Sequence, residues 1–229
     1  MNRFLFLPFV ILLLTSCDKY KVEGLASDAG LDGRMLFIKI LDEERNWRNI
    51  DSCEVVHGEF SMKGDADTTM MATLFMDETP ILPLVIEKGT LRISVNGQET
   101  KVSGTPLNDA LYDFLEQQNS IESKVRDLFH RESQMILNGD NPDEAHEMVS
   151  REGQKLSEEM NELVIDFITG NFDNVLSSGV FVLLVSNMPC PVVTPEIKQI
   201  MDKAPESFKE NFMVKEFMAA AEENTGRLR

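Results

Sequence analysis

The chain has 229 residues, with 22 Lys and Arg against 39 Asp and Glu, and a formal net charge of −17 at pH 7. This excess of carboxylates repels phosphate backbones, so the composition excludes nucleic-acid binding through a basic surface, and we expect no nucleic-acid partner. Hydrophobic residues make up 42% of the chain, which is enough for a packed core and excludes a disordered acidic tail.

The N-terminus has the pattern of an export signal. Arg3 is followed by the apolar run Phe4–Leu14, which is too short to span a bilayer comfortably as a helix. A basic start, a short apolar core and then small residues are typical of a secretory signal. The run ends in Leu14-Thr15-Ser16-Cys17, which resembles the bacterial lipoprotein box. This resemblance implies cleavage before Cys17 and acylation of its thiol and of the new N-terminus.

We therefore expect residues 1–16 to be a lipoprotein signal peptide and Cys17 to be the lipid-attachment site. An ordinary cleaved signal with a chance cysteine, or a buried apolar N-terminal helix, is the alternative. Removal of residues 1–16 takes away Arg3 and no acid, so the net charge goes from −17 to −18. An acyl anchor rather than a basic patch would then attach the protein to its membrane. The expected location is the cell envelope, at the outer membrane or the periplasmic face, with inner-membrane retention left open by Asp18.

Residues 17–105 are predicted to form an antiparallel β-sandwich. Short β-branched and aromatic stretches alternate there with Gly, Asp and Asn turns. Val56–Glu59 has the form of a tight hairpin, with His57-Gly58 at the position where Asn-Gly is usual. Glu87–Thr90 indicates a second turn. The predicted strands have the sequences YKVEGLA, MLFIKIL, DSCEVV, EFSMKG, MMATLFM, LPLVIE and TLRISVN.

Residues 106–229 are predicted to be α-helical, which makes the fold class α+β. Apolar residues recur at helical spacing from Leu107 to Met135 and again from Ala145 to Phe167, which predicts a long helical hairpin. Asn141-Pro142 provides a cap and a first helical residue for its second arm. Further on, an apolar helix is expected near Val180–Val185, a helix start at Thr194-Pro195, and a continuous helix over residues 205–224.

Several of these segments together resemble a known family. They are similar to the N-terminal domain of unknown function that precedes a thioredoxin-like domain in many lipoproteins of Gram-negative anaerobes. The helical region from Leu107 resembles the stretch before that redox domain. The family's redox motif, Trp-Cys-x-x-Cys, does not occur in this sequence, so we do not expect oxidoreductase activity. The matching residues are Ile50, Asp51 and Ser52; Gly58, Phe60 and Gly64; Glu87 and Gly89; and Gly104, Thr105 and Asn108.

The matching residues are structural in kind. Gly58, Gly64 and Gly89 suit turns, Phe60 suits a core, and Asn108 suits a helix N-cap. The chemistry-bearing residues elsewhere do not form a catalytic set: the three histidines are scattered, no calcium-loop or zinc spacing occurs, and we expect no metal and no cofactor.

Two cysteines besides Cys17 are candidate redox thiols. Cys53 lies in a predicted strand, where we expect it to be buried and inert. Cys190 lies between two prolines and is expected to be a packing residue in a rigid turn. The alternative is disulfide exchange by either thiol with a separate thioredoxin-like partner.

The sequence favours a lipid-anchored, non-enzymatic binding or scaffold module for a peptide or protein partner. The alternative is an accessory role in a thiol–disulfide redox system through Cys190 or Cys53. A hydrolase using an unrecognised pair of carboxylates is the least supported reading, because no two acids stand out among the many. The 13 Met and 14 Phe are assigned to the core by default, although some of them would suit a partner groove.

Overall fold

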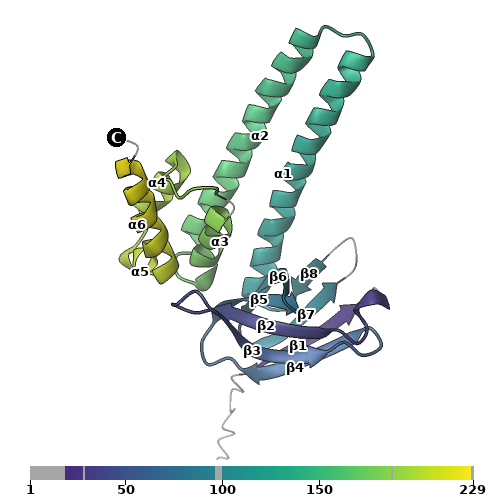
Figure 1. Ribbon diagram of the computed structural model, residues 1–229, viewed down its shortest axis with the longest axis vertical. Helices are drawn as coiled ribbons and strands as arrows, with labels where there is room; N and C mark the ends of the chain where they lie inside the picture. Colours follow the sequence, from purple (N-terminus) through teal and green to yellow (C-terminus); the bar gives the residue numbers. More distant parts are fainter. Residues whose placement is uncertain (1–18, 28, 96–99, 187, 228–229) are drawn as a thin grey trace, which may run out of the picture.

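The computed structural model describes residues 19–27, 29–95, 100–186 and 188–227, and its first part is a β-sandwich (Figure 1). One sheet has the strand order β4-β1-β7-β8, and we call it sheet A; the other has the order β3-β2-β5-β6, and we call it sheet B. The strands are β1 (Lys19–Ala26), β2 (Met35–Leu41), β3 (Trp47–Glu54), β4 (Glu59–Asp65), β5 (Met70–Met76), β6 (Thr79–Ile86), β7 (Gly89–Val95) and β8 (Thr100–Ser103), with a short 3-10 helix at Ala29–Leu31.

The two sheets form because each strand has one apolar face. In β1 the side chains alternate strictly between exposed and buried. Buried apolar side chains of β2, β4, β5, β6, β7 and β8 complete the interior. Val22, Ile38 and Leu84 are fully buried between the sheets. Neighbouring strands are antiparallel apart from β1 and β7, which run parallel. The expected sandwich is therefore confirmed, with one parallel pair that the sequence did not indicate.

The predicted hairpin at Val56–Glu59 is confirmed. The Val56 and Glu59 backbones bond each other in both directions, at 2.9 and 3.1 Å. His57 and Gly58 both have positive φ, at 54° and 76°, as a type I′ turn requires. This turn connects β3 of sheet B to β4 of sheet A, so it carries the chain from one layer of the sandwich to the other.

Gly64 does not form a turn, contrary to expectation. It lies within β4 opposite Tyr20 of β1. A β-carbon there would fall 2.7 Å from the Tyr20 ring, so the residue is Gly because the ring needs the space. A second glycine makes room for an aromatic ring in the same way. Gly24 of β1 lies opposite Phe60 of β4, and a β-carbon on Gly24 would lie 2.0 Å from the Phe60 ring. Phe60 is buried, as predicted.

The second part of the chain is helical, which confirms the α+β class. The strands end at Ser103 and the first helix begins at Pro106, where the composition changes. A long antiparallel hairpin rises from the β6 and β8 end of the sandwich, while β4 and β1 lie on the opposite side (Figure 1). Three further helices and one helical turn pack beside its base. The helices are α1 (Pro106–Leu137), α2 (Pro142–Gly170), α3 (Val175–Ser186), α4 (Pro195–Lys203), α5 (Glu206–Lys209) and α6 (Phe212–Arg227).

A compact joint fixes α1 to the sandwich. The Glu87 carboxylate accepts hydrogen bonds from the backbone N–H groups of Leu107 (2.9 Å) and Asn108 (3.2 Å), and so caps the positive end of the helix. The N-cap residue is Thr105, so the prediction of an Asn108 cap is wrong. The fully buried Asn108 side chain instead accepts from Val85 N (2.9 Å) and donates to Val85 O (2.8 Å), continuing the hydrogen bonding of edge strand β6.

The helical hairpin has an apolar seam and polar cross-links. Its second arm begins as predicted, with the Asn141 side chain accepting from Asp143 N at 3.0 Å and Pro142 as the first helical residue. Lys124 of α1 bonds Glu159 of α2 at 3.0 Å. At 32 residues, α1 is about 48 Å long, so the hairpin tip lies far from the sheets.

The helices after the hairpin follow the sequence with one correction. Helix α3 and the Thr194 start of α4 lie where they were predicted, with the Thr194 hydroxyl accepting from Ile197 N at 3.3 Å. The continuous helix expected over residues 205–224 is wrong, because α5 ends at Lys209 and α6 begins at Phe212. The Asn211 side chain accepts from Met213 N at 3.1 Å, so it caps a new helix instead of continuing the previous one.

Candidate functional site

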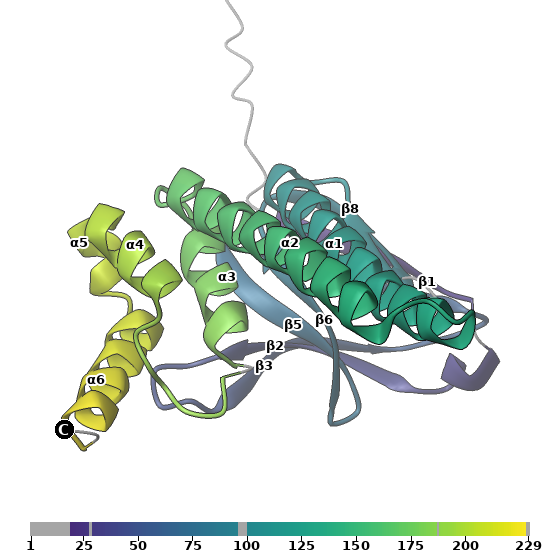
Figure 2. The ribbon, with the colours of Figure 1, turned by 90° about the horizontal axis from the view of Figure 1, so that it is seen from above.

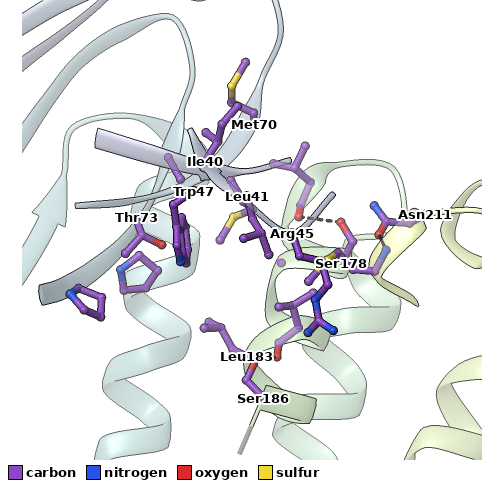
Figure 3. Close-up of a pocket in the computed structure, with 18 of the residues that line it drawn as sticks. Ile40, Leu41, Arg45, Trp47, Met70, Thr73, Ser178, Leu183, Ser186 and Asn211 are labelled. Carbon is purple, nitrogen blue, oxygen red and sulfur yellow. Dashed lines mark hydrogen bonds between the residues drawn. The ribbon is translucent and has the colours of Figure 1, made fainter. Parts of the chain in front are cut away.

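An apolar groove lies between the outer face of sheet B and the C-terminal helices. Its volume is about 610 Å³. Trp47 and Thr73 line it from the sheet, and Leu183 and Ser186 line it from α3 (Figure 3). The start of α6 closes one end with Met213. Figure 2 shows α3 between the hairpin and the group α4–α6, where it contacts β5. We call this feature the sheet B groove.

Trp47 is held at the groove by aromatic packing. Its ring meets the ring of Phe75 edge-on, with the centroids 4.9 Å apart. The Lys39 ammonium lies on Phe75 as well, 4.6 Å from the ring centroid, and bonds Glu78 at 3.2 Å. Such contacts fix a large side chain in one place at low entropic cost. Trp47 nevertheless remains 49% exposed, so it is positioned but not buried.

A glycine sets the distance between α3 and the sheet. A β-carbon on Gly179 would lie 2.6 Å from Cγ of Met71, a residue of β5. The missing side chain lets the helix approach the strand closely at this point. On the same helix, Leu183 is 37% exposed and faces the open part of the groove (Figure 3). Helix α3 therefore contacts β5 closely at Gly179 and lines the open groove at Leu183.

The tip of the β2–β3 hairpin reaches the C-terminal helices at the rim of the groove. Arg45, at this tip, has a positive φ of 64° and donates to the Glu216 carboxylate of α6 at 3.2 Å. The loop is shaped by Asp42, whose side chain accepts from Glu44 N and Asn46 N. Both members of the Arg45–Glu216 ion pair are exposed, so the pair positions the loop more than it stabilises the fold.

The described lining of the sheet B groove contains neither a carboxylate nor a histidine, and Arg45 is its charged residue. What it offers is apolar contact, together with hydroxyl and amide groups from Thr73, Ser178, Ser186 and Asn211. This combination suits the recognition of apolar side chains, with a few polar groups to orient the backbone that carries them.

The structure does not bring the predicted site cysteines together. Cys17 lies outside the described residues. Cys53, on β3, is half-buried and unpaired; burial raises the pKa of its thiol, and a hydrogen bond from the Ser61 backbone opposes that rise. Cys190 is also unpaired, and it is exposed in the segment between α3 and α4 instead of packed within its turn.

Within residues 19–27, 29–95, 100–186 and 188–227, no group of three or more His, Cys, Asp or Glu side chains could hold a metal ion. In the same part of the chain, no helix has the length and apolar character needed to cross a bilayer.

Sequence reasoning did not find the sheet B groove. Its residues come from two stretches, 40–83 and 175–213, which the fold brings together. Trp47, Met70 and Met71 look like core residues in the sequence, because a partly exposed apolar side chain has the same pattern as a buried one. The one available signal was the suggestion that some methionines line a partner groove.

Comparison with known proteins gives a partial assignment. Residues 20–111 match the family model described as "Domain of unknown function (DUF4369)". The match runs from the second residue of β1 into the first residues of α1, so it includes the joint at Glu87 and Asn108. A search of curated proteins and a search of solved structures each found no match to the chain.

Proposed function

We propose that this chain is a lipid-anchored cell-envelope protein that acts as a non-enzymatic binding module, and that the sheet B groove takes an extended apolar segment of a protein partner. The observation that carries the proposal is the groove itself: about 610 Å³, lined mainly by apolar side chains, with Trp47 positioned yet half-exposed. Pockets of this size and lining are typical of ligand sites.

Two features favour an extended peptide as the occupant. The groove adjoins β3, which is an edge strand of sheet B and begins with three exposed residues, Trp47–Asn49. An edge strand offers backbone groups to a peptide that adds to the sheet, and its alternate side chains would point into the adjoining groove. Methionines such as Met70 and Met213 adapt to varied apolar side chains, as at other adaptable binding surfaces.

Attachment through Cys17 is the second part of the proposal. It is supported by the sequence of the export signal and by the position of β1, which begins at Lys19, two residues after that cysteine. The thioredoxin-associated family that the sequence resembles suggests that the partner is a separate thioredoxin-like lipoprotein. The binding segment would belong to that partner.

The single tryptophan of the chain allows a direct test. A blocked peptide of alternating leucine and threonine serves as the probe, and the emission of Trp47 is the readout. We expect a saturable blue shift, because an occupant of the groove removes water from the half-exposed indole. Leu183→Glu places a carboxylate in the apolar lining and should weaken binding by about tenfold or more.

Phe129→Glu is the matched control. Phe129 is 59% exposed on α1, outside the groove, so this variant should bind the peptide as the wild type does. The proposal fails if the peptide causes no shift, or if a peptide with serine in place of leucine gives the same shift. An equal response to palmitate would also overturn it, since the groove would then be a lipid site.

A further inference from the structure

The outer face of sheet A carries a charge opposite to that of the whole chain. Alternation along β4, β1, β7 and β8 points three acids and five bases outward. This exposed face therefore has an excess of two positive charges on a chain of net −17. We call it the cationic face; its charged residues are Lys19, Lys21, Lys63, Arg92 and Lys101, with Glu23, Glu59 and Asp65.

The strand register gathers these cations. Lys21 lies directly opposite Lys63 on β4, and Glu23 lies between Ser61 and Arg92 on the neighbouring strands. Like charges placed opposite each other are unfavourable within a sheet, so the Lys21–Lys63 pair does not stabilise the fold. The pair suits an external anion that would bind both ammonium groups.

A shallow depression of about 570 Å³ marks the middle of the face. Lys21, Arg92 and Lys101 line it together with the hydroxyl-bearing Ser94 and Ser103. Two carboxylates, Glu23 and Glu59, line it as well. Glu23 is ion-paired with Lys21, which lowers the pKa of the Glu23 carboxyl, and Lys101 is ion-paired with Glu116 of α1 at 3.7 Å. Ammonium, guanidinium and hydroxyl donors on one surface are the groups that bind phosphate oxygens.

We propose that the cationic face lies against the anionic phospholipid surface of the membrane to which the chain is attached, and that it thereby orients the molecule. This inference rests on the membrane attachment proposed above. Strand β1 supplies Lys19 and Lys21 and is the first described element after the N-terminal segment, so the face lies where the chain would meet its anchor. Attraction to anionic headgroups acts within about 8 Å at physiological salt, which is the range of a surface held close by a tether.

The orientation would leave the sheet B groove accessible. The outer faces of the two sheets of a sandwich point in opposite directions, so a membrane under sheet A leaves the groove on sheet B free. The hairpin rises from the β8 edge of sheet A, roughly along the direction in which the strands of that sheet succeed one another, so it would run alongside the membrane (Figure 1).

In the test, the protein is attached to vesicles artificially, so the result does not depend on whether Cys17 is acylated. A histidine tag replaces residues 1–18, which lie outside the described structure, and holds the protein on vesicles containing nickel-chelating lipid. A donor dye is placed on Leu137→Cys at the hairpin tip, where the side chain is 85% exposed, with Cys53→Ser and Cys190→Ser to keep labelling specific. The readout is energy transfer to an acceptor lipid.

We expect high transfer on vesicles that contain phosphatidylglycerol, because a hairpin that runs alongside the membrane keeps the dye near the surface. Transfer should fall on phosphatidylcholine vesicles, in 1 M salt, and in the variant Lys21→Gln, Lys63→Gln, Arg92→Gln. The matched control, Arg151→Gln, Lys155→Gln, Lys198→Gln, makes the same charge change on exposed helical residues and should behave as the unsubstituted protein.

Two results would overturn the inference. One is equal transfer on anionic and neutral vesicles. The other is a fall in transfer when phosphate replaces chloride at constant ionic strength, which would show that the face binds free phosphate. Unfolding curves of the two triple variants confirm that both are folded. The peptide titration of Trp47 is independent of this outcome, so failure of the orientation and failure of the groove are distinguishable.

Discussion

Cys53 and Cys190 differ in how readily each can form a thiolate. Burial raises the pKa of the Cys53 thiol, whereas Cys190 is exposed. Because the thiolate is the reactive form, a raised pKa lowers the reactive fraction at any pH below it. We therefore expect iodoacetamide at pH 8 to alkylate Cys190 several-fold faster than Cys53, and we expect the Cys53 rate to keep rising at higher pH. Mass spectrometry of the separate peptides measures both rates.

Alkylation in urea is the control, because the two thiols should react at similar rates once the chain is unfolded. Equal rates in the folded protein would contradict the effect of burial. The same measurement bears on the redox alternative, since only a thiol that reacts in the folded state could exchange disulfides with a partner. If either thiol has such a role, we expect it to be Cys190.

At the scale of elements, the joint between α1 and the sandwich depends on Asn108. Its side chain satisfies the backbone N–H and C=O of Val85, a fully buried residue on the free edge of β6. Asn108→Ala would leave both groups buried without these partners. We expect the free energy of unfolding to fall by about 2–4 kcal/mol, measured by urea denaturation, since each unsatisfied buried group costs about 1–3 kcal/mol.

Asn161→Ala provides the comparison for Asn108→Ala. The Asn161 amide donates to the Glu196 side chain at 3.1 Å in a partly exposed site, where water can replace the lost bond. Its loss should therefore reduce the free energy of unfolding by less than about 1 kcal/mol. Similar losses in the two variants would show that Asn108 has no special role at the joint.

Most elements were predictable because their signals are local. Alternation within MLFIKIL and MMATLFM reproduces β2 and β5 to the residue, and Asn141-Pro142 marks the start of α2. The role of Asn108 was not predictable, because an Asn near the start of a helix is ordinarily its N-cap. The structure shows that Thr105 is the N-cap residue and that the Glu87 carboxylate accepts from the first N–H groups of the helix. The break at Asn211 was missed because the flanking residues favour a helix.

At the scale of the whole molecule, the sheet B groove and the cationic face both depend on which strands belong to which sheet. The parallel pairing of β1 with β7 places Arg92 beside Glu23 and brings the basic residues of distant segments onto one face. No local pattern encodes this pairing, so only the net charge, and not its distribution over the faces, was predictable. The net charge predicts repulsion from anionic surfaces for the molecule as a whole, whereas the outer face of sheet A has an excess of basic residues.

Attachment through Cys17 is the last prediction, and it concerns the whole molecule. The wild-type protein should partition into the detergent phase of Triton X-114, because acyl chains outweigh the hydration of an acidic domain. Cys17→Ser should move it to the aqueous phase. The free energy of unfolding should stay the same, since every described element begins at Lys19 or later.

Cys190→Ser tests whether the loss of any cysteine has this effect, and it should stay in the detergent phase with the wild type. A wild-type protein in the aqueous phase would contradict the anchor, as would a Cys17→Ser variant that remains with the detergent. If the anchor is confirmed, β1 begins two residues from the lipid. So short a connection, at most about 7 Å when fully extended, keeps the cationic face near the headgroups, within the range over which its charges act.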